Sequence, residues 1–141
     1  MDLVERTFEA KVDNLHDVLG FLEEQLEAHD ASMKMITVMS ISVEEMYANV
    51  CMYAYEGQPE VGNCKVTISF EDDSVIVVLT DDGIPFDPLE KVDPDIHAAA
   101  EDRGIGGLGI YMVKEYMDEC KYERANEQNI FTMRKKIKWV I

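Results

Sequence analysis

The stretch that decides the fold is an apolar run that stops at a turn, Val75-Ile76-Val77-Val78-Leu79-Thr80-Asp81-Asp82-Gly83-Ile84-Pro85. A continuous run of β-branched and apolar residues is typical of a strand buried in the middle of a sheet. Ligands often bind where such a strand meets a loop. The Asp81 carboxylate can accept a hydrogen bond from an exocyclic amine such as that of adenine, and Gly83 lets the backbone approach a flat ring. An ordinary Asp-Gly turn is the alternative interpretation of these residues.

The segments on either side of this strand predict an α+β domain. Before it we expect a strand, two helices and a half-buried strand; after it come a long loop, a helix and two closing strands. The expected bounds are about 4–10, 13–28, 32–55 and 66–70, then 108–117, 120–124 and 130–138. Short turns between neighbouring strands predict a mixed, mostly antiparallel sheet with the helices on one face, a two-layer α/β sandwich. No linker or repeat divides residues 1–141, so we expect one domain.

The second predicted helix carries Glu45 and Asn49, four residues apart and therefore neighbours on one edge. A carboxylate beside an amide oxygen suits a hard cation such as Mg²⁺, and the carboxylate can instead act as a base on a hydroxyl or water. A solvated polar edge of the helix is the alternative interpretation.

A glycine-rich segment, Arg103-Gly104-Ile105-Gly106-Gly107-Leu108-Gly109, precedes the third predicted helix. Glycines before a helix expose backbone N–H groups at its positive end, which suits phosphate. The segment does not directly follow a strand, so it is not a dinucleotide-binding fingerprint, and the GxxxxGK[ST] phosphate loop does not occur. A flexible hinge is the other explanation.

The bulk composition narrows the possible partners. The net charge of -16 repels nucleic acid and anionic lipid, so we expect the protein to contact neither nucleic acid nor a membrane directly. No apolar run is long enough to cross a bilayer, and the first residues do not resemble a signal peptide, so we expect a cytoplasmic protein. The three cysteines and three histidines have no metal-ligand spacing.

Taken together, the three motifs make the sequence resemble the histidine-kinase-like (Bergerat-fold) ATPases, whose three boxes occur in this order. Within them it is most similar to the bacterial anti-sigma-factor serine-protein kinases. The most specific stretches are 106–114 and 81–88, and the resemblance covers nearly the whole chain.

The resemblance implies a role for each matching residue. Glu45 matches the glutamate that acts as base on the protein substrate, Asn49 the asparagine that holds magnesium, and Asp81, with Gly83 beside it, the adenine-reading aspartate. Gly107, Leu108 and Gly109 match the glycine box, near which the phosphates would lie. Arg103 at its flank is a candidate to contact the γ-phosphate, and Thr132 on the last strand is a candidate to contact the nucleotide. Residues from about 89 to 106 match the lid over ATP. Tyr53 stands where many members have histidine.

The function implied is that of an ATP- and Mg²⁺-dependent protein serine/threonine kinase and anti-sigma factor. Its implied partners are an anti-anti-sigma protein of the STAS type, which it phosphorylates, and a sigma factor, which it sequesters; family members commonly form homodimers. The alternative is a non-catalytic ATP-binding module that uses the nucleotide to choose its partner. The catalytic domain of a sensor histidine kinase ranks low, because no helical hairpin with a phospho-accepting histidine precedes the domain.

Overall fold

A computed structural model of the chain describes residues 2–90 and 108–137. The chain order of the longer elements is strand, two helices, two strands, helix and two strands. Their bounds are β1 Asp2–Glu9, α1 Leu15–Ala28, α2 Met33–Asn49, β2 Asn63–Glu71, β3 Ser74–Asp81, α3 Leu108–Tyr116, β4 Glu119–Ala125 and β5 Gln128–Lys136. A π-helical turn, η2 Val50–Ala54, continues α2, and short 3-10 turns lie at Val12–Asn14 (η1) and Pro88–Glu90 (η3).

The five strands form one sheet in the order β1-β2-β3-β5-β4, and every pairing is antiparallel. The sequence predicts a mixed, mostly antiparallel sheet; in the described residues all strand pairings are antiparallel. The run Val75–Leu79 lies in β3, the central strand, as its composition predicts. The register pairs Asp81 with Cys64 on one side and with Asn129 on the other. The end of β3 is therefore flanked by side chains from both neighbouring strands.

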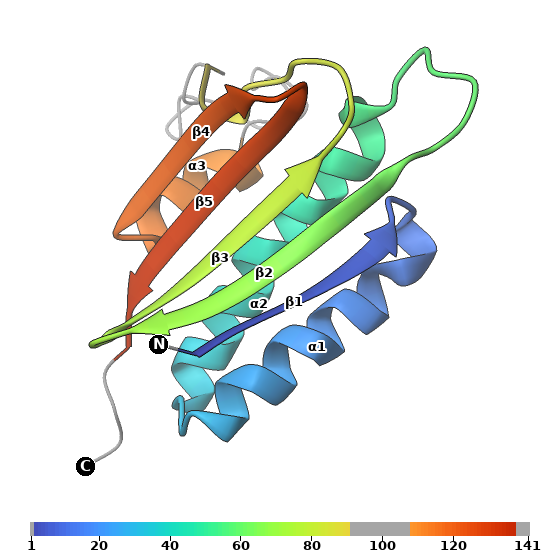
Figure 1. The fold of residues 1–141 in the computed structure, drawn as a ribbon. Coiled ribbons are helices and arrows are strands. Elements are labelled where there is room, and N and C mark those ends of the chain that lie inside the picture. The colour runs from blue at the N-terminus through green and yellow to red at the C-terminus, as the bar shows by residue number, and fades with distance from the viewer. Residues whose placement is uncertain (1, 91–107, 138–141) are drawn as a thin grey trace.

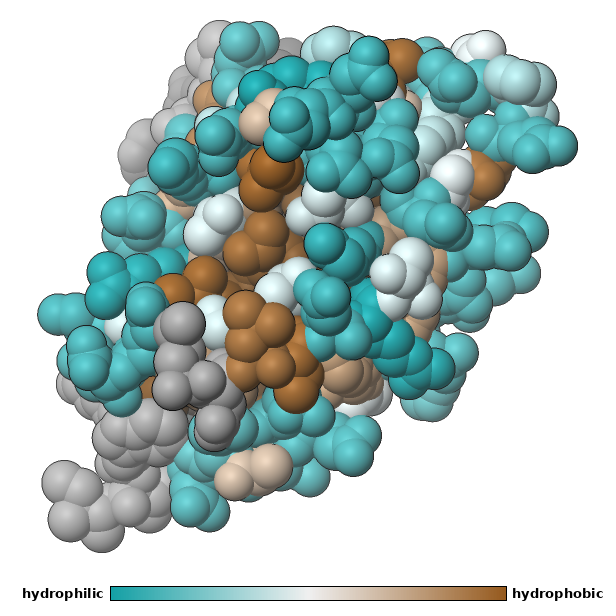
Figure 2. All heavy atoms as spheres, viewed as in Figure 1, coloured by the Kyte–Doolittle hydropathy of each residue, from teal (hydrophilic) through white to brown (hydrophobic). Residues whose placement is uncertain are grey.

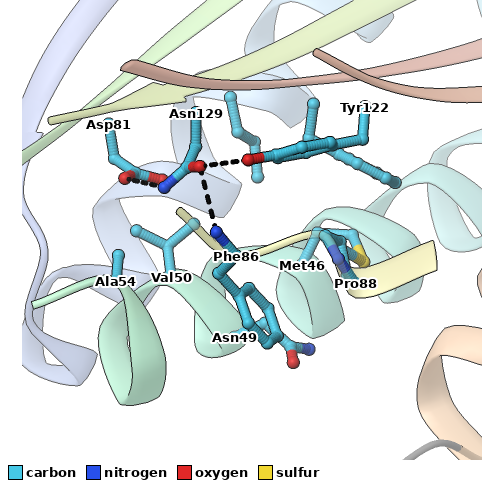
Figure 3. Close-up of a pocket in the computed structure, with 11 residues that line it drawn as sticks. Met46, Asn49, Val50, Ala54, Asp81, Phe86, Pro88, Tyr122 and Asn129 are labelled. Atoms are coloured by element: carbon cyan, nitrogen blue, oxygen red, sulfur yellow. Dashed lines mark hydrogen bonds between the residues drawn. The ribbon is translucent and has the colours of Figure 1, made fainter. Parts of the chain in front are cut away.

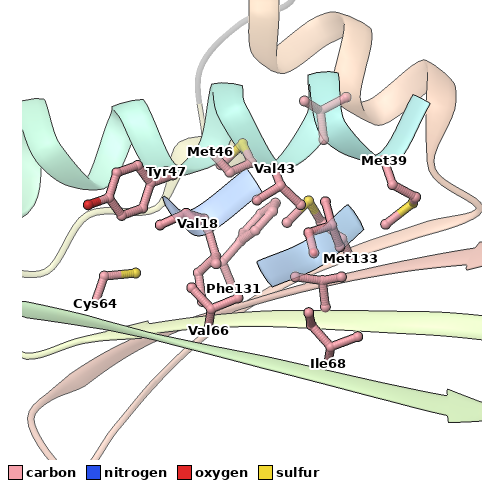
Figure 4. Close-up of a cluster of buried hydrophobic side chains, with 14 of the residues drawn as sticks. Val18, Met39, Val43, Met46, Tyr47, Cys64, Val66, Ile68, Phe131 and Met133 are labelled. Atoms are coloured by element: carbon pink, nitrogen blue, oxygen red, sulfur yellow. The ribbon is translucent and has the colours of Figure 1, made fainter. Parts of the chain in front are cut away.

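The three α-helices of the described residues cover one face of the sheet (Figure 1). Helices α1 and α2 pack against each other, and α3 packs against α2. The core lies between α2 and the sheet, where Val43 and Met46 face Val66, Phe131 and Met133 (Figure 4). These side chains are at most 5% exposed, which removes a large apolar area from water and holds the two layers in a fixed register.

The predicted helix over 32–55 is a regular α-helix only as far as Asn49. The change to π geometry rotates the last turn and directs Tyr53, Ala54 and Tyr55 toward the segment after β3, to which each is joined. Single π turns inside helices often occur at functional sites. None of the described helices is long and apolar enough to cross a membrane.

Candidate functional site

Glu45 and Asn49 lie on the part of α2 that faces the interior, not on a solvated edge. Asn49 is 4% exposed and the neighbouring Ser42 is fully buried, while Glu45 is half-buried. The Asn49 Nδ2 donates a 2.8 Å hydrogen bond to the Glu45 carbonyl, one turn earlier. This bond fixes the amide, so its oxygen is the atom that Asn49 can offer to a ligand.

Gly109 brings the start of α3 against the carboxylate of Glu45. A Cβ atom at position 109 would lie 2.1 Å from Glu45 Cδ and 2.2 Å from Oε2, far inside van der Waals contact. A side chain at position 109 would force the Glu45 carboxylate or the start of α3 to shift. The Glu45 carboxylate therefore lies at the N-terminal end of a nine-residue helix, where the unpaired backbone N–H groups and the helix dipole favour negative charge.

The end of the second helix holds the segment after β3 in place. Ile84 N donates a 2.7 Å hydrogen bond to the Ala54 carbonyl, and a Cβ at Gly83 would lie 2.1 Å from that same oxygen. Asp82 N donates to the Tyr55 hydroxyl at 3.0 Å. These contacts explain why glycine stands at position 83: the two backbones approach too closely for any side chain.

The Tyr53 and Phe86 rings stack with their centres 5.1 Å apart, which adds an aromatic contact between the same two segments. Tyr53 therefore supports the loop that follows Asp81.

Asp81 is a buried carboxylate, 4% exposed, that accepts two hydrogen bonds on one oxygen. Its Oδ1 accepts from Gly83 N and from Asn129 Nδ2, both at 2.9 Å. Burial raises the pKa of the Asp81 carboxyl above its ordinary value, and the hydrogen bonds from Asn129 and Gly83 oppose that rise, as does the nearby Arg124 guanidinium. Arg124 in turn donates to the Gly83 carbonyl at 2.8 Å.

A narrow pocket lies between α2 and the sheet, with Asp81 and Asn49 both in its wall (Figure 3). The rest of the wall is apolar or aromatic except for Asn129: Met46, Val50, Ala54, Leu79, Phe86, Pro88, Tyr122 and Phe131. An apolar pocket with a few fixed polar groups is the usual form of a small-molecule site. Asp81 in its wall can accept a hydrogen bond from a donor that enters the pocket.

The structure brings most of the predicted site residues together. Glu45 contacts Gly109, and Asn49 and Asp81 both line the pocket. Gly83 donates a backbone hydrogen bond to the Asp81 carboxylate. Leu108 begins α3. Arg103, Gly107 and the predicted lid from residue 91 onward lie outside the described residues.

Thr132 lies away from this site. It pairs with Val78 and Lys121, in the positions that alternate with the buried Phe131 and Met133, so it belongs to the sheet face opposite the helices.

Asn129 is not among the site residues that the sequence predicts, yet its position on β5 puts it beside Asp81. A signal was available: Asn129 is in step with Phe131 and Met133, and a polar residue at an inward-facing position of a strand marks a buried polar site. Tyr122, which contacts Asn129, and Phe86 are not among the predicted residues either. Nothing in the sequence alone shows that β4, β5 and the turn after β3 meet.

Comparison with known proteins points to one family. A model of the histidine kinase-like ATPase domain matches residues 8–135. An anti-sigma F factor of Clostridium novyi is 24% identical over 110 residues, covering 77% of this chain and 76% of that protein. A serine-protein kinase RsbW of Listeria monocytogenes is 31% identical over 94 residues, covering 64% of this chain and 59% of its own length.

Among solved structures, the fold is similar to that of the RsbU and RsbW domains of a Mycobacterium tuberculosis protein. The TM-score is 0.68 at 15% identity, and the match covers 100% of this chain and 35% of that one. This likeness shows a shared fold. The chain thus corresponds to one part of a longer solved protein.

Proposed function

Because the chain belongs to the histidine kinase-like ATPase domain family, we propose that it binds ATP with Mg²⁺ and phosphorylates a serine or threonine of a partner protein. The observation that carries the proposal is the contact between Glu45 and Gly109. It places a carboxylate from α2 at the N-terminal end of α3, one helical turn from Asn49 in the pocket wall. A carboxylate, the N-terminal end of a helix and a pocket lined mainly by apolar and aromatic side chains then lie next to one another.

The magnesium proposal rests on the chemistry of Asn49. The described residues contain no group of three or more His, Cys, Asp or Glu side chains that could hold a metal. Magnesium is commonly held instead by one or two protein oxygens together with substrate phosphates. The Asn49 amide oxygen fits that role, because the amide nitrogen is already bonded to the Glu45 carbonyl. A bound magnesium ion would offset phosphate charge in a protein whose net charge is -16.

In the proposed reaction Glu45 is the general base. Its carboxylate accepts the proton of the partner's hydroxyl as the hydroxyl oxygen attacks the γ-phosphorus, and ADP leaves with the electrons of the cleaved bond. Backbone N–H groups of the Gly107–Gly109 turn, at the start of α3, stabilise charge on the phosphate oxygens. Asp81 accepts a hydrogen bond from the adenine amino group, and Arg103 contacts the γ-phosphate from the lid formed by residues 89–106.

The partners we propose follow from the relatives named above. An anti-anti-sigma protein of the STAS type supplies the hydroxyl. A sigma factor is the second partner; this chain sequesters it in the cytoplasm until the anti-anti-sigma protein displaces the sigma factor. A homodimer is supported by the sheet face opposite the helices, where an apolar band runs across the surface (Figure 2). The register places Leu3, Ile76, Val78 and Ile130 on that face.

The experiment that tests the proposal compares Glu45→Gln with Glu44→Gln, its exposed neighbour on the same helix. Both variants and the wild type are incubated with ATP, Mg²⁺ and a STAS-domain protein encoded beside this chain, and phosphate transfer is measured. Binding of ATP is followed separately by the shift in thermal unfolding. We expect Glu45→Gln to keep ATP binding and to lose at least 100-fold in the rate of transfer, within the range typical of general bases. Glu44→Gln should transfer at the wild-type rate.

Three outcomes would contradict the proposal at different points. Normal transfer by Glu45→Gln would remove Glu45 as the base. If the wild type binds ATP but transfers no phosphate to such a partner, the chain is a partner-switching module that uses ATP only to set its shape. An unchanged unfolding temperature at millimolar ATP would remove nucleotide binding itself.

A further inference from the structure

Asn129 uses its full hydrogen-bonding capacity inside the pocket wall. Its Nδ2 donates to Asp81 Oδ1 at 2.9 Å and to the Ile84 carbonyl at 2.7 Å. Its Oδ1 accepts from Phe86 N at 3.2 Å and from the Tyr122 hydroxyl at 2.5 Å (Figure 3). An amide side chain has two N–H donors and two acceptor positions, and all four are used here. At 5% exposure these bonds have little competition from water.

These bonds decide which oxygen of Asp81 a ligand can reach. Oδ1 accepts from both Asn129 and Gly83, whereas within the described parts of the chain no group donates to Oδ2. Asp81 also lines the pocket. The carboxylate is therefore held with one oxygen engaged by the protein and the other available to a hydrogen-bond donor.

The same bonds favour the ionised form of Asp81. Burial raises the pKa of its carboxyl, and Asn129 is the leading influence in the opposite direction, ahead of Gly83 and Arg124. The neighbouring titratable and charged groups come from the strands and turns around it: Asp82, Arg124, Cys64, Tyr55 and Tyr122. Of these, Arg124 is the only cation. It lies on the same face of β4 as Tyr122, and its side chain is exposed.

We infer that Asn129 is a positioning and specificity-determining residue: it presents Asp81 to the pocket as a pure hydrogen-bond acceptor, so that the pocket selects a purine bearing an amino group over one bearing a carbonyl oxygen. The inference rests on the proposed function for its choice of ligand. It assigns the selection to the pair Asn129–Asp81. An isolated carboxylate in this apolar wall would more readily take up a proton and then offer a donor as well as an acceptor.

The test uses two substitutions at Asn129 and matched substitutions at Gln128. Asn129→Ser shortens the donor, and Asn129→Asp replaces it by a second carboxyl group against Asp81. Gln128 is the preceding residue, and its amide makes an equivalent 2.9 Å bond to Asp82, but on the exposed side. Gln128→Ser and Gln128→Glu therefore make the same chemical changes beside an aspartate that does not line the pocket. Circular dichroism confirms that each variant is folded.

The first measurement is the dissociation constant for ATP and for inosine triphosphate, whose base carries a carbonyl oxygen in place of the amino group. Wild type should prefer ATP, and Asn129→Ser should reduce that preference at least about tenfold, which corresponds to about 1.4 kcal/mol. In Asn129→Asp two adjacent carboxylates cannot both ionise without repulsion. Its ATP affinity should rise as the pH falls from about 8 to about 6, because one shared proton restores a donor to Asp81. Wild-type affinity should stay level or fall over the same range.

The second measurement needs no nucleotide: the carboxyl carbon of Asp81 is titrated by NMR. Its pKa should be higher in Asn129→Ser than in wild type and unchanged in Gln128→Ser. An equal pKa in all three proteins, or an ATP preference that survives Asn129→Ser within twofold, would overturn the inference. If wild type binds neither nucleotide, the proposed function fails, while the titration still decides whether Asn129 controls the ionisation of Asp81.

Discussion

At the scale of single residues, Gly83 and Gly109 stand at two close approaches between the segments of the site. Gly83 lets the turn after β3 press against the Ala54 carbonyl, and Gly109 lets α3 begin against the Glu45 carboxylate. In both places a Cβ atom would come within 2.1 Å of another atom. The absence of a side chain therefore sets how closely the three motifs approach one another.

Gly109→Ala should cost activity more than stability. Alanine is the better helix former by about 1 kcal/mol, but its methyl group has to displace the Glu45 carboxylate or the start of α3. A displacement of about 1 Å of a catalytic group can cost about 100-fold in rate. We expect a loss of that order in phosphate transfer, measured with saturating ATP and partner.

The matched control for that substitution is Gly20→Ala in α1, where a Cβ would meet nothing within 4 Å. It should raise the free energy of unfolding by about 0.5–1 kcal/mol and leave the rate of transfer unchanged. Transfer by Gly109→Ala within twofold of wild type would show that the Glu45 position is not critical.

At the scale of elements, α2 is the element that positions the site. Its middle supplies core side chains, its C-terminal part supplies Glu45 and Asn49, and the following π turn holds the loop after β3. Its N-terminus is capped by Ser32, whose hydroxyl oxygen accepts a 3.2 Å hydrogen bond from Met35 N. The cap lies roughly 26 Å from Asn49 along the helix, at a rise of about 1.5 Å per residue.

Ser32→Ala should therefore lower stability without changing the site. We expect a loss of about 1 kcal/mol in the free energy of unfolding, measured by urea denaturation, because one donor in the first turn loses its partner. Ser32→Asp, which preserves an acceptor, should restore most of it. The ATP dissociation constant should be the same in all three proteins; a change in it would mean that the two ends of α2 are coupled.

At the scale of the whole molecule, the sheet has one covered face and one open face. The helices bury the inward-facing positions, while the outward-facing ones include the apolar band seen in Figure 2. Apolar bands of this kind on a sheet are candidate interfaces. This is the surface that we propose for homodimer formation.

Val78→Lys, at the centre of that face, should yield a monomer by sedimentation analysis, because burying an unpaired ammonium group in an interface is costly. ATP binding should persist, since position 78 alternates with the pocket-side residues of β3. Glu24→Lys, at an exposed position of α1 in the helix layer on the other face of the sheet, is the control and should leave the association state unchanged. A monomeric wild type would contradict the proposed homodimer. An unchanged dimer in Val78→Lys would show that the interface lies elsewhere.

The sequence by itself determined the order of the elements, the central place of Val75–Leu79 and the three motifs that identify the family. These features can be predicted from the sequence because they depend on local patterns: hydrophobic periodicity, turn residues and glycine-rich helix starts. The one strand-borne residue placed by family resemblance alone, Thr132, lies on the opposite face of the sheet from the pocket.

The tertiary structure alone decided which side chains meet. Asn129 is separated from Asp81 by 48 residues in the chain yet lies opposite it in the sheet. The contact between Glu45 and Gly109 likewise depends on how α2 and α3 pack. Such contacts follow from the register of strands and helices fixed by burial of the whole core, a property that no local segment carries.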